Sequence, residues 1–418
     1  MGKLNHKKLC LLFFIIGIAI CMFCEFCLPE RPQVKSGDEV IVSNALKQSE
    51  EPLGKESDVS GDTQETPELN ISDNLGATPE AEKKDEGNID TTPVDQPMVA
   101  KGQNIVLNAE GYPQILSNDK IKMYNDTGTA VIGDTGYEIY NYVPSVASAY
   151  AKVINNAGKL FDKDVKIYDI LIPTGVGVTL PDNKMDKVNS SHQGESIEKI
   201  MSKIKSPVET VSLYDALMTH RTEYIFYRTD HHWSAKGAYY GYRKICEVTG
   251  RTPHELSEYT KKNFGGFIGT YYGDTNGNKD LRKDSVAAYY PVSENISMTY
   301  RTESGATATG DVIVDSSRFG ISGKYLAFMG GDNSYSVITN KDIKDGSACV
   351  VVKESFGNAL VPYMADHYSK IYVVDYRYYS DKLSKLVREK KVQEVFFMNN
   401  ISMTRNSYLV GKLSQLVK

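Results

Sequence analysis

Hydrophobic and polar positions divide the chain into three regions with different patterns. An apolar run occupies residues 9–24, and the segment from 30 to 100 contains no aromatic residue at all. In residues 101–418, short apolar runs alternate with stretches that have helical spacing. The last region is therefore the part of the chain that has the pattern of a folded domain.

Strand-like runs and helix-like segments follow one another through most of residues 101–418. Helices are predicted over 145–161, in the segment NALVPYMADHYSK, and from Ser234 to a stop at Gly250. Because strands that alternate with helices are typical of a parallel sheet, the pattern predicts an α/β fold with helices flanking the sheet. Residues 252–345 are less regular and predict an antiparallel insertion. The predicted strands are KIYDILI, Glu223–Tyr227, Ala348–Val352, Ile371–Asp375 and Val392–Met398.

Residues 1–28 have the features of a membrane anchor. Lys3, Lys7 and Lys8 precede the apolar run, which with its flanking residues approaches the ~20 residues that cross a bilayer. Positive charge on this side predicts that the N-terminus stays in the cytosol. A cleaved signal peptide is the alternative, but no small-residue cleavage site follows the run. We expect an uncleaved single-pass anchor in the cell membrane, with the rest of the chain outside.

Residues 29–100 have the composition of a disordered linker. From residue 30 to residue 100 there are 17 acidic and 6 basic residues, and the segment is rich in Pro, Thr and Ser. Such a segment cannot bury enough apolar surface to fold, and its charge repulsion favours extended conformations. The remaining residues, 101–418, carry a net charge of only +4, which is too small to indicate nucleic-acid binding, and we expect none.

The motif TDHHWS directly precedes the helix predicted from Ser234. In an extended segment, residues two apart point the same way, so Asp230 and His232 can pair while His231 points elsewhere and supports the loop. A carboxylate bonded to one ring nitrogen leaves the other nitrogen to act as a base. We expect Trp233 to pack beneath this loop.

Two other interpretations of the motif are open from the residues alone. Asp and His are good ligands for zinc or iron, and a His–Trp cluster can serve simply as a structural cap of the helix. A metal site needs a third ligand, and the remaining histidines are scattered along the sequence, with no H-E-x-x-H motif. We therefore expect no metal ion and no cofactor.

The segment KESFGN lies between a predicted strand and a predicted helix. Such a turn exposes the Oγ of Ser355 as a nucleophile and offers backbone N–H groups to an oxyanion; an ordinary helix cap is the alternative. Serine needs a base that a carboxylate orients, and Asp230 and His232 supply both. Four further residues are candidates for contacts with the oxyanion or the substrate: Asn358, Gly331, Asn333 and Arg377. An ordinary turn or a surface ion pair is the alternative explanation for each of them.

Two segments together, YRTDHHWSAKGAYYGY and VVKESFGNALVPYMADHYSKIYVVDYRYY, resemble the bacterial DHHW protein family. That family is similar to the alginate O-acetyltransferases of the AlgJ and AlgX type, which are SGNH-hydrolase-like. The resemblance covers about residues 101–418 and implies an SGNH-hydrolase-like domain with Asp230, His232 and Ser355 as its catalytic triad. The chain departs from the standard SGNH pattern because Lys-Glu-Ser stands where those enzymes have Gly-Asp-Ser.

The resemblance implies an extracytoplasmic O-acetyltransferase that modifies a bacterial cell-envelope or secreted polysaccharide. An integral membrane partner of the membrane-bound O-acyltransferase type would supply the acetyl group to Ser355. A sugar hydroxyl of the polysaccharide acceptor would then take it. A carbohydrate esterase with the same triad and a non-catalytic glycan-binding module are the alternatives.

Overall fold

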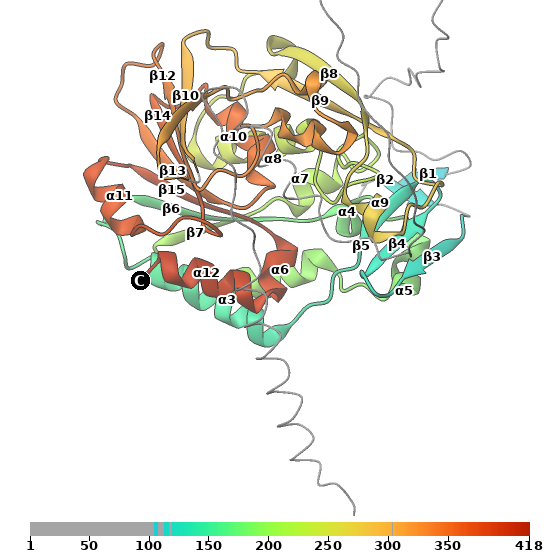
Figure 1. The fold of residues 1–418 in the computed structure, drawn as a ribbon. Helices are drawn as coiled ribbons and strands as arrows, with labels where there is room; N and C mark the ends of the chain where they lie inside the picture. The colour runs from blue at the N-terminus through green and yellow to red at the C-terminus, as the bar shows by residue number, and fades with distance from the viewer. Residues whose placement is uncertain (1–103, 108–112, 117–118, 303) are drawn as a thin grey trace, which may run out of the picture. The chain divides into compact units, whose positions relative to one another are not determined.

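The computed structural model describes residues 104–107, 113–116, 119–302 and 304–418 (Figure 1). The predicted anchor, residues 1–28, and the predicted linker, residues 29–100, lie outside the described residues. Within the described part of the chain, no helix combines the length and the apolar character that crossing a membrane requires.

An eight-stranded mixed sheet organises the described domain, in the order β11-β10-β12-β14-β13-β15-β6-β7. The five strands from β14 to β7 run parallel, whereas β10, β11 and β12 pair antiparallel. The predicted α/β fold is therefore confirmed, and strands of the predicted insertion extend the same sheet. The strands are β6 (Lys166–Ile172), β7 (Val208–Ser212), β10 (Ile296–Arg301), β11 (Thr307–Gly310), β12 (Tyr335–Asn340), β13 (Ala348–Lys353), β14 (Lys370–Asp375) and β15 (Glu394–Asn400).

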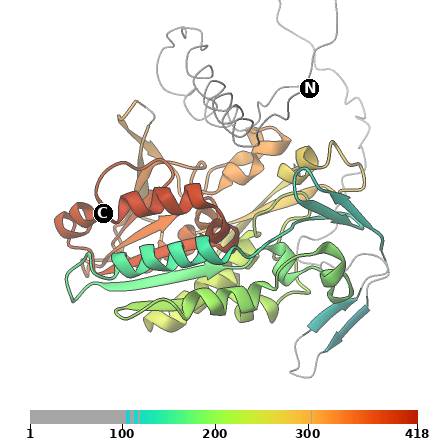
Figure 2. The ribbon, with the colours of Figure 1, turned by 90° about the horizontal axis from the view of Figure 1, so that it is seen from below.

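Side chains of the parallel strands alternate between two hydrophobic cores, one on each face of the sheet. In β13, Cys349 and Val351 belong to one core, and Val350 and Val352 belong to the other. Helices α8 and α10 cover the first face, and α3, α11 and α12 cover the second (Figures 1 and 2). Burial on both faces explains why these strands are continuous apolar runs.

The helices lie close to the segments that show helical spacing. Most of the described helices are short, and the two longest of these are α3 and α8. The α-helices are α3 (Pro144–Ala157), α4 (Gly175–Val178), α5 (Met185–Val188), α6 (Gln193–Met201), α7 (Tyr214–Met218), α8 (Ala235–Thr249), α9 (Thr270–Asp274), α10 (Gly357–Met364), α11 (Leu383–Glu389) and α12 (Ser407–Leu416).

Three small antiparallel sheets complete the described domain. One pairs β8 with β9, a second contains β3, β4 and β5, and a third pairs β1 with β2. Their bounds are β1 (Asn104–Leu107), β2 (Pro113–Leu116), β3 (Ile121–Tyr124), β4 (Thr129–Ile132), β5 (Thr135–Glu138), β8 (Thr260–Phe267) and β9 (Asp284–Tyr290).

One predicted strand is wrong: residues 223–227 do not join any sheet. Phe226 forms only an isolated bridge with Trp233, and the Ser234 N–H donates to the Ile225 carbonyl at 2.9 Å. The segment thus folds back on the motif that follows it. Its apolar side chains are buried in the core beside α8, which explains a strand-like composition without sheet pairing.

Candidate active site

A buried carboxylate holds the backbone just before the TDHHWS motif in place. Asp284, at the start of β9, accepts hydrogen bonds from the Arg228 N–H at 3.0 Å and the Thr229 N–H at 2.8 Å. It also accepts from the Thr229 hydroxyl at 2.6 Å and from the Tyr224 hydroxyl. The loop is therefore anchored to an element more than 50 residues away, which restricts where Asp230 can lie.

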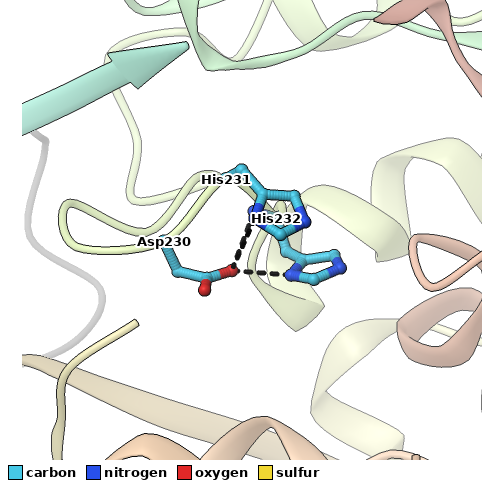
Figure 3. A group of neighbouring side chains, drawn as sticks. All are labelled: Asp230, His231 and His232. Carbon is cyan, nitrogen blue, oxygen red and sulfur yellow. Dashed lines mark hydrogen bonds and ion pairs between the residues drawn. The ribbon is translucent and has the colours of Figure 1, made fainter. Parts of the chain in front are cut away.

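The structure brings Asp230, His232 and Ser355 together. His232 Nδ1 lies 2.6 Å from Asp230 Oδ1, and His232 Nε2 lies 2.7 Å from Ser355 Oγ. Asp230 Oδ1 also accepts from the His232 N–H, and Oδ2 accepts from the Thr270 N–H at 3.1 Å. Figure 3 shows the aspartate and the two histidines of the motif on their loop. With both carboxylate oxygens bonded, the imidazole is held with Nδ1 towards the aspartate and Nε2 towards the serine.

The charges of the site favour a neutral imidazole beside an ionised carboxylate. Burial opposes ionisation of Asp230, but the adjacent His231 and His232 outweigh it and lower its pKa below the ordinary value. Burial and the neighbouring His231 lower the pKa of His232, against the opposing effect of Asp230. An ionised Asp230 accepts the Nδ1 proton, so the Nε2 lone pair of His232 can accept the proton of Ser355 Oγ.

Aromatic rings fix the plane of the His232 ring and the position of the serine turn. The Tyr325 ring stacks on His232 with centroids 4.1 Å apart, and its hydroxyl donates to the Ser355 carbonyl at 3.1 Å. Trp233 is fully buried, and its Nε1–H donates to the Phe356 carbonyl at 2.9 Å. Trp233 therefore links the histidine loop directly to the turn that carries the serine.

His231 does not point away from the pair, so that expectation is wrong. Its ring lies 3.9 Å from the His232 ring, and its Nδ1 lies 2.9 Å from Thr270 Oγ1 (Figure 3). One potential ligand atom from each of Asp230, His231 and His232 lies within 4.8 Å of the others, so the three could hold a metal ion. An ion there would displace bonds of the triad, because Asp230 Oδ1 and both His232 nitrogens are already engaged.

Ser355 opens into a pocket of about 620 Å³ at the carboxyl ends of the parallel strands. This is the edge at which ligands bind in open α/β sheets. The pocket also extends over η5 (Ile401–Arg405) and the start of α12. Besides Ser355, the polar residues of its wall are Glu138, His231, Glu354, Arg377, Asn400, Ser402, Arg405, Asn406 and Ser407.

Arg377 lies in this pocket wall and is held by a buried ionic network. Its Nη2 is 2.6 Å from Asp375 Oδ2 and 2.7 Å from Asp332 Oδ2. Lys353, which is almost fully buried, pairs with the same two aspartates. Asn358 Nδ2 donates to Asp332 Oδ1 at 2.8 Å. Burial opposes the charge of Arg377, but the aspartates outweigh it and raise its pKa.

The other predicted oxyanion candidates already have acceptors. Asn358 bonds Asp332, Asn333 Nδ2 donates to the Met329 carbonyl, and the Gly331 N–H donates to the Phe328 carbonyl. None of these three residues lines the pocket that contains Ser355.

Comparison with known proteins places the chain in a family. The sequence model described as DHHW protein matches residues 55–374, which is more than half of the chain. The chain belongs to the DHHW family. Both segments of this DHHW protein that carry Asp230, His232 and Ser355 lie inside the match, whereas Arg377 and the pocket wall from Asn400 onward lie beyond it.

Solved structures agree with this assignment. A DHHW family protein from Eubacterium siraeum is 28% identical, with a TM-score of 0.63, and the match covers 76% of this chain and 100% of that one. PatB1 from Bacillus cereus is 19% identical, with a TM-score of 0.55 and coverage of 69% and 97%, which shows a shared fold. The O-acetyltransferase domain of AlgJ from Pseudomonas putida reaches a TM-score of only 0.37 at 10% identity, with coverage of 75% and 99%. No curated protein sequence matches the chain. This DHHW protein therefore shares with PatB1 an α/β fold, here built on a large mixed sheet flanked by helices.

Several residues of the site were missed by sequence reasoning. Glu354 accepts the Phe356 N–H at 3.0 Å and the Asn400 N–H at 2.9 Å, and so ties the serine turn to the end of β15. Its position beside Ser355 was the one available signal. Tyr325 and Asp284 lie in the irregular region, where no periodic pattern marks a residue as close to the motif.

Proposed function

We propose that this DHHW protein is an O-acetyltransferase that acts outside the cytoplasm on hydroxyl groups of a polysaccharide. The observation that carries the proposal is the bridging position of His232, 2.6 Å from Asp230 and 2.7 Å from Ser355. Nucleophilic serine acyl transfer requires this order of carboxylate, imidazole and hydroxyl. Family membership and the fold shared with PatB1 support the same chemistry.

The geometry supports a two-step transfer through an acyl-enzyme. Ser355 Oγ attacks the acetyl carbonyl of the donor while His232 Nε2 takes the serine proton, and Asp230 stabilises the imidazolium. The imidazolium then gives this proton to the departing donor group, which leaves an acetyl ester on Ser355. In the second step, a sugar hydroxyl gives its proton to His232 as its oxygen attacks the ester, and Ser355 departs with that proton.

The remaining parts of the proposal concern the acetyl donor and location. We propose that an integral membrane protein of the membrane-bound O-acyltransferase type delivers the acetyl group. The predicted single-pass anchor, residues 1–28, would keep the domain at the same membrane, and the predicted linker, residues 29–100, would let it reach a polymer outside. The pocket volume of about 620 Å³ supports an acceptor of sugar size.

Trapping the acyl group tests the proposal. The full-length protein is incubated with p-nitrophenyl acetate, and peptide mass spectrometry then locates the acetyl group, which we expect on Ser355. Ser355→Ala should lower p-nitrophenolate release by at least about a thousandfold, whereas Ser317→Ala, at an exposed serine, should not. One solved PatB1 structure carries a sulfonyl adduct, so a sulfonyl fluoride provides a second probe of the same serine.

Two outcomes would contradict parts of the proposal. Acetyl transfer by Ser355→Ala at an unreduced rate would exclude the serine mechanism altogether. Acetylation of Ser355 followed by release to water alone, with a range of sugars present in excess, would identify the protein as an esterase.

A further inference from the structure

On the β15 side, the pocket wall consists mostly of residues that lie beyond the family match, whereas Glu138 lies inside it. Asn400 ends β15, Ser402 and Arg405 belong to η5, and Glu138 ends β5 beside them. We call these four residues the η5 wall. All four line the pocket into which Ser355 opens, so a molecule that attacks an acetyl group on Ser355 would meet them.

Each arginine of the pocket is already paired with a carboxylate. Arg405 Nη2 lies 2.5 Å from Glu138 Oε1, and Arg377 is held between two aspartates. Glu354, next to the nucleophile, has no cation within ion-pair distance among the described residues. Because each arginine is neutralised by its carboxylate partners, Glu354 adds one negative charge that no ion pair of the described residues offsets, and the arginines serve as hydrogen-bond donors rather than as unpaired cations. An anionic acceptor would be repelled at short range.

The η5 wall also contains two polar atoms without a partner in the described part of the chain, of which Asn400 Oδ1 can only accept a hydrogen bond. Asn400 Oδ1 and Ser402 Oγ are buried and have no hydrogen-bond partner among the described residues. Buried polar atoms are normally paired, so these two atoms indicate a missing ligand group. A carbonyl oxygen can accept only from a donor, and a hydroxyl group can donate whereas a carboxylate or phosphate cannot. The same hydroxyl groups can accept from Arg405.

We propose that the η5 wall is the acceptor subsite and that it takes an uncharged sugar residue, recognised through its hydroxyl groups, in preference to a uronate. The inference rests on the proposed acetyl transfer and adds the class of acceptor. It follows from two independent features: the paired arginines beside the unpaired carboxylate of Glu354, and the buried Asn400 Oδ1, an acceptor without a donor among the described residues. A sugar carboxylate would satisfy neither feature.

Matched acceptors test this on the unaltered full-length protein. Glucose and galactose oligomers are compared with the same oligomers carrying a carboxylate at C6 and with the corresponding C6 amides, with p-nitrophenyl acetate as donor. At low salt, we expect kcat/KM for the neutral sugar and for the amide to be at least about fivefold above kcat/KM for the uronate. Added salt should reduce this difference in kcat/KM. Equal use of the three forms, or a preference for the uronate, would overturn the inference.

A pair of charge variants locates the discrimination. Glu138→Gln releases Arg405 from its ion pair, so kcat/KM for the uronate should rise about fivefold or more relative to the neutral sugar. Glu209→Gln, which removes an exposed carboxylate on the edge strand β7, changes the net charge equally and should leave that ratio unchanged. An unchanged ratio in Glu138→Gln would overturn the assignment of the subsite.

The first step separates this inference from the proposed function. If no acetyl-Ser355 forms in the absence of sugar, the proposed function fails. If acetyl-Ser355 forms normally but the uronate is the better acceptor, only the η5-wall inference fails.

Discussion

His232 combines two contacts whose effects on its proton are opposed. In the proposed mechanism, Asp230 stabilises the charged imidazole that forms when Ser355 loses its proton, whereas burial and His231 favour the neutral imidazole before the reaction. An imidazole that is neutral at rest and charged only in the transition state is suited to general base catalysis. The site thus favours the proton transfer at near-neutral pH.

The lowered pKa of His232 leads to a prediction about pH. Because only the neutral imidazole can take the Ser355 proton, acylation should rise as pH increases, with a midpoint below the ordinary histidine value of 6.5. The measurement is the initial release of p-nitrophenolate between about pH 4 and 8 at constant ionic strength. A midpoint above 6.5 would mean that Asp230 outweighs burial and His231.

Trp233 makes a hydrogen bond that only an indole can provide at this position. Trp233→Phe would leave the buried Phe356 carbonyl without its donor and should lower the free energy of unfolding by about 1–3 kcal/mol, before any cost of the smaller ring. Urea unfolding measures this change. It is followed by circular dichroism because the variant lacks the only tryptophan of the chain, so tryptophan fluorescence cannot be used. Tyr408→Phe, at an exposed ring, is the control, and an equal effect in both variants would contradict the prediction.

Individual residues were predictable from the sequence where their chemistry depends on local spacing. Asp230 and His232 lie two apart, and the structure brings them together. The contacts of Thr270 with Asp230 and of Tyr325 with His232 join segments 40 or more residues apart. No sequence pattern encodes such pairs, because they depend on how the loops after β8 and before β12 fold back over the sheet.

At the level of elements, the short helix α9 sets the position of Asp230. A Cβ added at Gly269, the N-cap of α9, would lie 2.2 Å from the Asp230 Cβ. Gly269→Ala should therefore displace Asp230 and slow acylation by about a hundredfold, since displacements of about 1 Å have that effect. Gly273→Ala in the same helix is the control, because its Cβ would meet no atom within 4 Å. Similar acylation rates in the two variants would show that α9 does not position Asp230.

The strand at 223–227 was mispredicted for a physical reason. A short apolar run is compatible with a strand, but also with any segment buried on all sides. Tyr224 is buried with its hydroxyl bonded to Asp284, and Ile225 accepts a hydrogen bond from Ser234 rather than from a strand. The long parallel strands were predicted correctly because both of their faces are buried, which gives continuous apolar runs.

At the scale of the whole domain, the buried carboxylate of Asp169 connects helix α3 to the sheet. Asp169 in β6 is fully buried and accepts a hydrogen bond from the Tyr150 hydroxyl of α3. Asn399 of β15 donates to the same hydroxyl at 3.2 Å. Asp169 Oδ2 has no partner among the described residues. Burial raises the pKa of Asp169 to about 7, against the effect of the Tyr150 hydrogen bond.

This shift gives a pH dependence of stability with a definite sign. Between its ordinary value of 3.8 and about 7, folded Asp169 keeps a proton that the unfolded chain releases. The contribution of Asp169 is therefore fully favourable below about pH 4 and is lost as pH rises to about 7. Asp169→Asn carries no titrating proton, so its stability relative to the natural protein should increase over this range, by on the order of 4 kcal/mol at most. Urea unfolding at several pH values from 5 to 8 measures the difference, with Asp186→Asn at an exposed site as the control. If the difference in free energy of unfolding between Asp169→Asn and the natural protein stays constant with pH, Asp169 is already ionised within the folded core.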